Sequence, residues 1–366
     1  MQLLFTRFPL ESAYGGAEVQ TIALMEELRR RGHTIGFLGS CSVLSKELRA
    51  RDFPCVDLTI GEPPVTKWGA ASFLWRAPRM RKKLLAALRG FPGVKAIFML
   101  SMSEKILMTE WAHEQGIRVF WIEHDRVGSW LRQNPWLSRL RALSKIVTTI
   151  VVSDLSRDIY VELGWRPEDI RVIPNGIDLT RWKKRETSAE TRGPELHIGT
   201  VARLSKEKGL DLLIEAVKDI PDALLDIVGS GKDETAIKTL AKRTNEQTTK
   251  RINVRPNVPD LCAFYQSLDI FVLPSREHDP FGLAAAEAMS LGIPTIVTDA
   301  CGIAGSLTNG EDALIVPAGD TAALCAAIMQ LRDPVLRATL GKAGAETART
   351  RFSKEAMADQ YEALLR

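Results

Sequence analysis

The chain is predicted to be an α/β protein of two Rossmann-like, doubly wound domains, and three features of the sequence predict this. Its 366 residues suffice for two domains of ordinary size. Apolar residues make up 45% and charged residues 26%, as is typical of globular proteins. A strand, a loop, a helix and a second strand follow one another twice, beginning near residues 3 and 196. Each such unit implies parallel strands joined by a right-handed crossover.

The first unit begins with an apolar strand at 3–6 and a loop that ends in Gly15 and Gly16. Apolar residues at helical spacing follow, so we expect a helix that ends at Gly32 and a strand at 34–38. Further strands of this unit are expected at 96–100, 119–123 and 150–153.

The second unit begins with a strand at 196–201, a polar loop and a helix at 210–217. The turn-rich segment 174–178 and a polar stretch at 183–194, which we interpret as a linker, separate the two units. The remaining strands of this unit are expected at 224–228, 270–273, 294–298 and 313–316.

These boundaries predict an N-terminal domain at 1–178 and a C-terminal domain at 179–351. A helical segment at 352–366 is expected to pack back on the N-terminal domain. Two doubly wound domains of this kind would face each other across a cleft and hold a ligand there, outside the carboxyl ends of their strands.

Basic and aromatic residues gather in one part of the first domain. Residues 63–150 contain 15 Lys or Arg against 5 Asp or Glu, and six of the eight tryptophans. Residues 68–89 contain six basic side chains and no acidic one. This composition suits an anionic membrane surface or acceptor, and the alternative is a solvated basic face over a tryptophan-containing core. We rank nucleic acid below the membrane role, and we expect Pro78 to interrupt any single helix here.

Several kinds of site are excluded by the sequence. No strand is followed by GxGxxG, residues 226–233 lack essential parts of a P-loop, and GxSxG is absent. The five cysteines are scattered without a CxxC pair, and there is no HExxH, so we expect reduced thiols and no protein-held metal. We expect neither a signal peptide nor a membrane-spanning helix, and therefore a cytoplasmic protein.

Two loops have residues that suit an anion. Gly15 and Gly16 precede a helix, where backbone N–H groups can approach a negatively charged ligand. Arg203 and Lys208 lie in the loop after the strand at 196–201 and can grip a diphosphate. The alternatives are a plain tight turn for the glycines and a solvated charged turn for the cations.

A third segment, 275–289, follows the strand at 270–273 and enters an alanine-rich helix. Gly282 and Leu283 would begin that helix and could hold a phosphate with their N–H groups. Glu287 has apolar neighbours on both sides, so its carboxylate should be buried and needs a partner. The hydroxyls of a ribose or a sugar would provide one.

The third segment resembles the acidic–x7–acidic signature of retaining glycosyltransferases of family 4, which have the GT-B architecture of two Rossmann-like domains. Asp279 and Glu287 have this spacing, and the context FGL, three small residues, E, AMS and GIP continues to Pro294. The other segments that fit, in order, are GGAE, VIPNGID, VARLSKEKGLDLLIEA and the glycine pair at 229 and 231. The resemblance spans nearly the whole chain.

The resemblance implies that the C-terminal domain binds a nucleoside diphosphate sugar. Arg203 and Lys208 match the cationic pair that holds the diphosphate and stabilises the leaving nucleotide, so that no metal or other cofactor is expected. Glu287 matches the acid that binds the ribose hydroxyls, and Asp279 matches the acid that contacts the donor sugar.

The resemblance also implies roles for backbone groups and for one histidine. Gly282 and Leu283, with Phe281 before them, match the segment whose N–H groups bind the sugar or phosphate. Gly16, preceded by Gly15, matches the glycine that approaches the diphosphate from the N-terminal domain.

His124 follows the strand at 119–123 and matches a histidine that reaches the donor sugar near the reaction centre; a structural histidine is the alternative. Asp279 departs from the family pattern, in which this acid is usually Glu, and the donor sugar therefore stays open.

The function implied is retaining, metal-independent transfer of a hexose from a nucleoside diphosphate sugar to a hydroxyl. The acceptor would be a glycan or a lipid-linked saccharide, in cell-surface polysaccharide or lipopolysaccharide synthesis. The N-terminal domain would hold this acceptor, with the protein peripheral on the inner face of the membrane. The alternatives are a catalytically silent nucleotide-sugar-binding protein and an epimerase of the same architecture.

Overall fold

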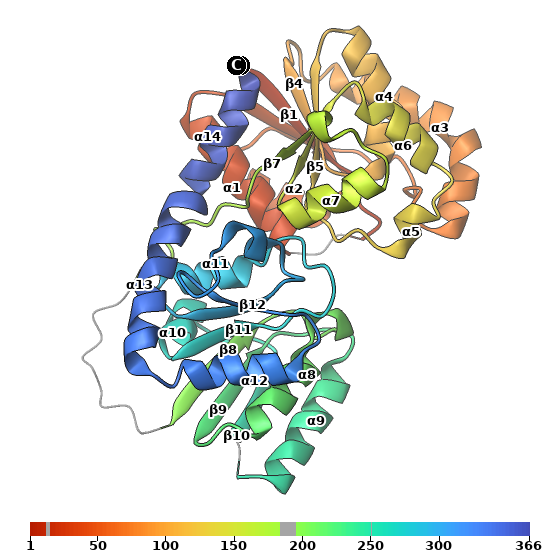
Figure 1. Cartoon of the computed structure of the whole chain (residues 1–366). Coiled ribbons are helices and arrows are strands. Elements are labelled where there is room, and N and C mark those ends of the chain that lie inside the picture. The colour runs from red at the N-terminus through yellow and green to blue at the C-terminus, as the bar shows by residue number, and fades with distance from the viewer. Residues whose placement is uncertain (12–14, 184–194, 250) are drawn as a thin grey trace. The chain divides into compact units, whose positions relative to one another are not determined.

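The structure, a computed structural model, describes residues 1–11, 15–183, 195–249 and 251–366. These residues form two compact units, Met1–Gly176 together with Met357–Arg366, and Ile177–Ala356 (Figure 1). Each unit is a parallel sheet with helices packed on its faces, which confirms the predicted α/β class. The expected linker at 183–194 lies, apart from Lys183, outside the described residues.

The sheet of the first unit has the order β3-β2-β1-β4-β5-β6-β7, so β1 lies at its centre. Phe5 of β1 lies opposite Phe37 of β2 and Phe98 of β4 in parallel register. The short strands β3 and β7 were not predicted. The described strands are β1 (Gln2–Arg7), β2 (Thr34–Gly39), β3 (Cys55–Asp57), β4 (Ala96–Met99), β5 (Arg118–Glu123), β6 (Thr148–Val151) and β7 (Ile170–Val172).

Helices cover both faces of this sheet, and an apolar core lies on each face. One core contains Leu24, Leu44 and Tyr361, and the other contains Phe73 and Leu140. Because both faces are buried, the central strands contain consecutive apolar residues, such as Leu3, Leu4 and Phe5 of β1. The described helices are α1 (Gly16–Arg30), α2 (Ser42–Arg49), α3 (Lys67–Leu88), α4 (Met102–Glu114), α5 (Ser129–Arg132), α6 (Leu137–Ser144), α7 (Asp154–Glu162) and α14 (Lys354–Leu365).

Helix α3 continues through Pro78, so the expectation that Pro78 interrupts it was wrong. Proline removes the N–H that would bond to the carbonyl of Leu74. Both residues lie on the exposed side of the helix, where water can bind that carbonyl. Phe73 and Met80 are buried on the inner side, before and after the proline, and hold both halves of the helix on the core.

The second unit has the sheet order β10-β9-β8-β11-β12-β13, all parallel. Its described strands are β8 (Leu196–Val201), β9 (Ala223–Val228), β10 (Arg251–Arg255), β11 (Ile270–Leu273), β12 (Thr295–Thr298) and β13 (Leu314–Val316). Its described helices are α8 (Leu210–Lys218), α9 (Glu234–Gln247), α10 (Leu261–Gln266), α11 (Leu283–Ser290), α12 (Thr321–Gln330) and α13 (Pro334–Arg351).

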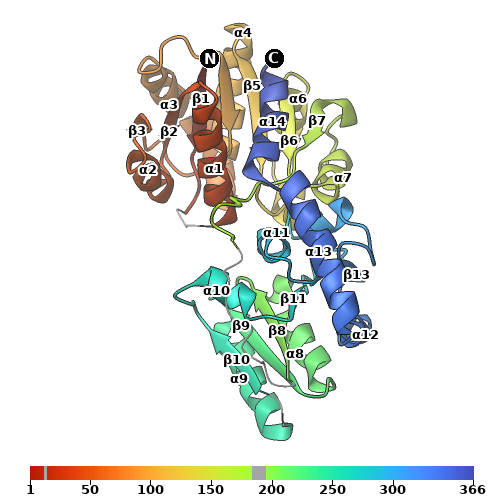
Figure 2. The same cartoon turned by 90° about the vertical axis from the view of Figure 1, so that its left-hand side faces the viewer.

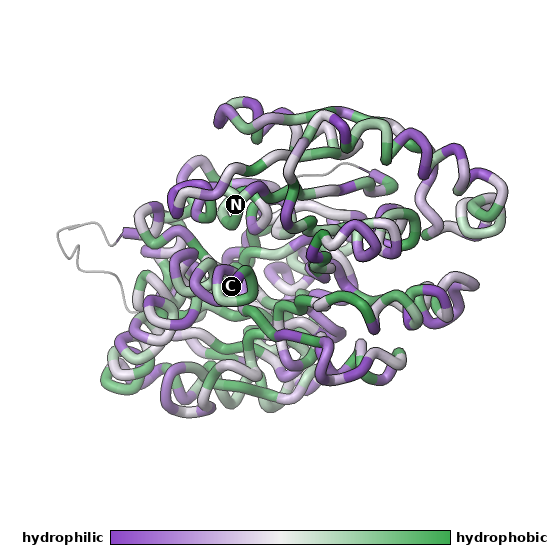
Figure 3. Tube along the Cα trace, turned by 90° about the horizontal axis from the view of Figure 1, so that it is seen from above, coloured by the Kyte–Doolittle hydropathy of each residue, from purple (hydrophilic) through white to green (hydrophobic). Residues whose placement is uncertain are grey.

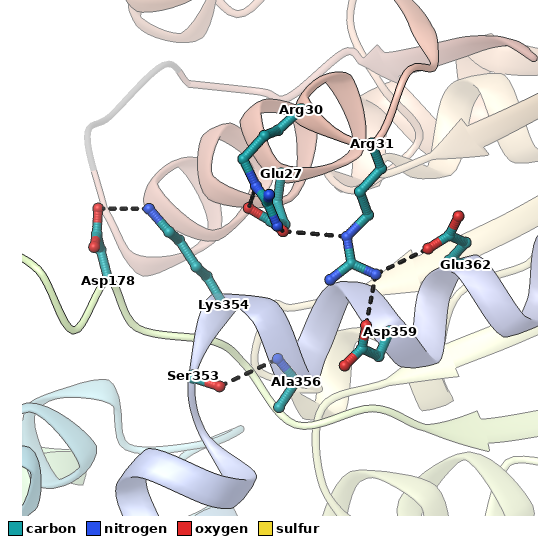
Figure 4. A network of polar contacts seen from close by, with 9 residues as sticks. All are labelled: Glu27, Arg30, Arg31, Asp178, Ser353, Lys354, Ala356, Asp359 and Glu362. Atoms are coloured by element: carbon teal, nitrogen blue, oxygen red, sulfur yellow. Dashed lines mark hydrogen bonds and ion pairs between the residues drawn. The ribbon is translucent and has the colours of Figure 1, made fainter.

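The end of the chain returns to the first unit, and both termini lie at one end of that unit (Figure 2). Helix α13 belongs to the second unit, whereas α14 packs along the first from Met357 onward. Arg31 of the first unit donates to Asp359 at 2.6 Å and to Glu362 at 2.9 Å (Figure 4). Tyr361 is 1% exposed and lies 6.0 Å from the ring of Phe98.

Within the described part of the chain, no helix is both long enough and apolar enough to cross a bilayer. Hydrophilic and hydrophobic stretches instead alternate along the helices and strands (Figure 3).

The C-terminal return should be a measurable part of the stability of the first unit. Replacing the buried ring in a Tyr361→Ala variant should lower the free energy of unfolding by about 3–5 kcal/mol, because a large cavity would open beside Phe98. Urea unfolding followed by circular dichroism measures this change. Met329→Ala removes a side chain that is 42% exposed and should change stability by less than about 0.5 kcal/mol. Equal losses in both variants would show that α14 does not stabilise the unit.

Candidate functional site

The most complete site in the second unit lies where its strand order reverses. Strand β8 has β9 on one side and β11 on the other, so the loops after β8 and β11 diverge from a shared edge. Ligands of doubly wound sheets bind at such a point, outside the carboxyl ends of the strands. Arg276 in the loop after β11 donates its N–H to the carbonyl of Glu207 after β8 at 2.8 Å. Leu204 likewise donates to Ser230 after β9 at 2.9 Å, so three loops meet here.

Two glycines permit this close approach. Gly209 has φ of 64°, and a Cβ there would lie 2.1 Å from the carbonyl oxygen of Pro274. A Cβ at Gly229 would lie 1.9 Å from the carbonyl oxygen of Ala202. Real Cβ atoms do not come this close to backbone oxygens, so any other residue would push the loops apart.

Lys208 and Asp279 are brought together at this edge. The Lys208 Nζ lies 2.5 Å from Asp279 Oδ2, and the Ser275 hydroxyl donates to the same oxygen at 3.1 Å. The N–H of Asp279 donates to the carbonyl of Ala300 at 2.9 Å, which fixes the backbone of the loop. The Asp279 side chain is 8% exposed and that of Lys208 is 19% exposed. The pair is thus a fixed, partly buried cation and anion at the end of the central strands.

Arg203 lies in the same loop and is exposed. Among the described residues its guanidinium makes no hydrogen bond or ion pair, which leaves its five donors for a ligand. The sequence prediction grouped Arg203 with Lys208 as one cationic pair. The structure shows that the two differ, because only Lys208 has a carboxylate partner.

The segment 281–283 contributes backbone rather than side chains. Phe281 is 3% exposed and packs edge to face on Phe352 with centroids 5.5 Å apart, so its ring belongs to the core. Gly282 has φ of 105° and precedes α11, which begins at Leu283. The first N–H groups of a helix have no acceptor within it and carry partial positive charge. They lie at the carboxyl end of β11 and suit an anionic or hydroxyl ligand.

Glu287 lies in α11 and accepts a hydrogen bond from the hydroxyl of Tyr265 at 2.8 Å. Burial raises the pKa of Glu287 to about 7, although Tyr265 and the charge of Arg181 act in the opposite direction. The sequence predicted a buried carboxylate with a partner. It gave no sign of Tyr265, which is fully buried in α10.

In the first unit, Gly15 and Gly16 stand at the start of α1, as predicted. The N–H of Gly15 donates to Glu18 Oε2 at 3.1 Å, so this glycine is engaged by a side chain of its own helix. Glu18 Oε1 also pairs with Arg7 at 2.6 Å, and both side chains are almost fully buried. The sequence did not indicate this ion pair, because Arg7 and Glu18 lie on a strand and on a helix with the glycine loop between them.

His124 follows β5 and has both ring nitrogens buried. Neither nitrogen makes a well-aligned hydrogen bond among the described residues, although the side chain of Asn175 lies close enough to favour the protonated form. Burial lowers the pKa of His124 to about 4, against the opposing charge of Asp125. The imidazole is therefore neutral at pH 7, when it can donate one hydrogen bond and accept another.

A cavity of about 370 Å³ lies within the first unit, at the carboxyl ends of β1, β4 and β5. Lys105 donates to Glu123 Oε1 at 2.7 Å inside it, and the Lys105 Nζ lies 5.8 Å from the centre of the Trp121 ring. The sequence did not single out these polar residues. The aromatic residues that line the cavity are Phe8, Trp121, Trp130, Tyr160 and Trp165.

The described residues contain no group of three or more His, Cys, Asp or Glu side chains placed to hold a metal ion. The charged groups that the loops bring to the edge of β8 and β11 include Lys208, Asp279 and Arg203, beside the N-terminal end of α11. This arrangement can bind an anion through fixed donors.

Two family models match consecutive parts of the chain. The model described as Glycosyltransferase Family 4 matches residues 14–181, and the model described as Glycosyl transferases group 1 matches residues 181–347. Together they cover most of the chain, and their junction lies close to the boundary between the two compact units.

Individual proteins and structures are also similar to the chain. The lipopolysaccharide core biosynthesis glycosyltransferases LpsD and LpsE of Rhizobium meliloti (strain 1021) are 36% and 32% identical over 211 and 206 residues. These matches cover 55% and 56% of this chain, and the chain spans only 58% and 59% of those proteins. The structure of Anabaena Alr3699/HepE in complex with UDP has a TM-score of 0.81, covers 100% and 99% of the two chains and is 19% identical. This likeness confirms the GT-B fold.

The raised pKa of Glu287 predicts a stability difference that depends on pH. The folded protein binds a proton that the unfolded chain releases above about 4.5, so this contribution to stability is lost as pH rises towards about 7. A Glu287→Gln variant keeps the hydrogen bond from Tyr265 and removes the charge. Without ligand, it should match the parent at pH 5 and be about 3 kcal/mol more stable at pH 8.

Urea unfolding of both proteins at the two pH values tests this prediction. Glu246→Gln is the matched control, because Glu246 is an exposed residue of α9 in the same unit. Its stability relative to the parent should be the same at pH 5 and pH 8. If the stability difference between Glu287→Gln and the parent did not grow from pH 5 to pH 8, the pKa of Glu287 would not be raised in the folded protein.

Proposed function

Because the chain belongs to the glycosyltransferases of family 4 and group 1, we propose that it transfers a hexose from a nucleoside diphosphate sugar to a hydroxyl of a glycan or lipid-linked saccharide, with retention at the anomeric carbon. The observation that carries this proposal is the Lys208–Asp279 pair at the strand-order reversal of the second unit. In this proposal Lys208 is the cation for the diphosphate, and Asp279 beside it is the acid for the donor sugar.

In the proposed donor site, each part of the ligand is bound by different groups of the second unit. Arg203, with its free guanidinium, and Lys208 bind the diphosphate. Asp279 accepts hydrogen bonds from sugar hydroxyls, and the N–H groups at the start of α11 bind a phosphate or sugar oxygen. Glu287 binds the ribose hydroxyls, which supply donors for the carboxylate that burial disfavours in the free protein.

We propose that the transfer needs no divalent metal. When the bond between the anomeric carbon and the phosphate oxygen breaks, negative charge develops on the departing diphosphate. Arg203, Lys208 and the positive end of α11 stabilise this charge, which is the task that a metal would otherwise perform.

Retention requires that the acceptor oxygen form its bond on the same face of the sugar from which the phosphate departs. We propose that the departing phosphate oxygen takes the proton of the acceptor hydroxyl on that face. One carbon–oxygen bond then breaks and one forms, and the proton moves to the nucleoside diphosphate. We propose that His124, which is neutral and makes no well-aligned hydrogen bond among the described residues, contacts a sugar hydroxyl and is not the nucleophile.

The acceptor is proposed to bind in the 370 Å³ cavity of the first unit. Aromatic rings pack against the C–H faces of a sugar, while Lys105 and Glu123 meet its hydroxyls. The similarity to proteins named for lipopolysaccharide core biosynthesis supports a lipopolysaccharide or other cell-surface glycan as acceptor. Such a reaction takes place in the cytoplasm, at the inner face of the membrane.

The donor proposal predicts which ligand stabilises the protein. Among UDP-, GDP- and ADP-linked sugars, one should raise the melting temperature in the presence of EDTA, since a ligand at 100 times its Kd adds about 2.7 kcal/mol. Arg203→Ala should remove most of this shift. Lys242→Ala, an exposed lysine of α9, should retain it. If every nucleotide sugar failed to stabilise a folded sample, the donor site would be wrongly assigned, and a shift seen only with added Mg²⁺ would contradict metal independence.

The acceptor proposal predicts a separate kinetic effect. Glu123→Gln should raise KM for the acceptor by about tenfold or more, because a buried hydrogen-bond acceptor weakens and Lys105 loses its partner. KM for the donor should stay within about twofold. Initial rates with a saccharide acceptor and the responding nucleotide sugar measure both constants. Glu110→Gln, on the outer face of the same unit, is the control, and a rise in donor KM alone would exclude the cavity as acceptor site.

A further inference from the structure

Three large apolar side chains stand exposed on one side of α3. Trp68, Leu74 and Trp75 are 68%, 68% and 60% exposed, and the two indole rings contact edge to face at 6.5 Å. Exposed single hydrophobic residues are ordinary, but a cluster of large ones marks an interaction surface. We call these three residues, with the basic residues described below, the α3 face.

The cluster is held outward by a well-anchored helix. The inner side of α3 is packed through Phe73, which is fully buried, and the Trp136 ring lies 5.1 Å from it. The Thr66 hydroxyl caps the helix by accepting from the N–H of Gly69 at 2.8 Å. The Trp136 indole donates to the carbonyl of Ala70 at 2.9 Å. The helix therefore cannot turn its exposed tryptophans into the core without losing these contacts.

Unpaired basic side chains extend the α3 face along the second half of the helix. The helix contains no Asp or Glu among its 22 residues. Among the described residues, none of the exposed basic groups of this half forms an ion pair, whereas Arg132 and Arg139 on neighbouring helices each pair with a glutamate. The exposed basic residues are Arg79, Arg81, Lys82, Lys83 and Arg89.

We propose that the α3 face binds the surface of an anionic lipid bilayer. Indole rings favour the boundary between headgroups and acyl chains, and Leu74 adds a side chain that can enter it. The cations of the second half meet lipid phosphates within the same plane, because they share one exposed side of a single helix. The inference rests on the proposed function only in that a lipid-linked acceptor would be presented at such a surface.

The pattern fits a bilayer better than a nucleic acid. A groove that tracks a phosphate backbone interleaves cations and aromatic rings. On α3 the large exposed apolar residues Trp68, Leu74 and Trp75 lie in the first half of the helix. Lys67 is the one exposed cation of that half among the described residues, and the other exposed cations cluster at 79–89. A bilayer accepts both groups at once, because its headgroup and acyl layers lie parallel.

The test is co-sedimentation of the full chain with vesicles of phosphatidylcholine alone and with added phosphatidylglycerol. Binding should require the anionic lipid, and tryptophan emission should shift to shorter wavelength. Replacing both exposed indoles, Trp68→Ser with Trp75→Ser, should abolish that shift. Reversing two charges, Lys82→Glu with Lys83→Glu, should weaken binding by at least about tenfold.

Matched controls separate the face from general effects of charge and exposure. Lys238→Glu with Lys242→Glu makes the same charge change on α9 of the second unit and should bind vesicles like the parent. Met329→Ser removes an exposed apolar side chain elsewhere and should also bind normally. All variants should keep the melting shift with the nucleotide sugar, so that lost vesicle binding is not mistaken for lost folding or a failed donor site.

Three results would overturn the proposal. They are equal binding to neutral and anionic vesicles, equal losses in the α9 control, and binding by the parent to neither vesicle. Displacement of the vesicles by an equal charge concentration of single-stranded DNA would assign the face to nucleic acid instead. The melting shift with a nucleotide sugar is measured separately, so its absence would count against the donor site and leave the vesicle result to stand.

Discussion

The parallel pairing of β8 with β11 is the constraint on which the proposed donor site depends. These strands are neighbours in space although about 70 residues separate them in the chain. Their carboxyl ends therefore bring Lys208 and Asp279 to 2.5 Å, with the start of α11 beside them. Gly209 and Gly229 let the loops approach each other, and the hydrogen bonds between loops fix them. The strand order thus decides which loops, and therefore which side chains, meet at the site.

Both units have buried ionisable groups near the carboxyl ends of strands, and burial shifts the pKa of each towards its uncharged form. Burial raises the pKa of Glu287 to about 7 in the second unit and that of Glu104 to about 8 in the first, and it lowers the pKa of His124 to about 4. Each group can then form hydrogen bonds with a ligand, and a bound hydroxyl or charge can change its pKa. Glu104 caps α4 by accepting the N–H of Ser101 at 2.7 Å. Glu287 and His124 have no such capping role, and their burial agrees with the ligand contacts proposed for them.

The central strands and the residues of the proposed donor site could be identified from the sequence, because both depend on local pattern. Apolar runs identify β1, β8 and β11, and the spacing of Asp279 and Glu287 places one acid before a helix and one inside it. The edge strands β3 and β7 have three residues each, and β3, β7 and β10 all lack the apolar run of a central strand.

The partners of the site residues could not be predicted, because they depend on contacts between distant elements. Tyr265 meets Glu287 across two helices, and Lys105 meets Glu123 from a helix to a strand. Nothing in the sequence around these residues indicates that the two members of either pair are in contact. Pro78 failed as a helix breaker for a related reason, since the packing of Phe73 and Met80 outweighs its local preference.

Hydrogen–deuterium exchange on the full chain, with and without a saturating nucleoside diphosphate sugar, tests the central claim most directly. The account predicts slower exchange in residues 203–209 and 281–287, because the N–H groups of both segments would be held by the ligand or by loops that it fixes. Protection confined to other segments, or no protection while the ligand is bound, would contradict the claim that the edge between β8 and β11 is the donor site.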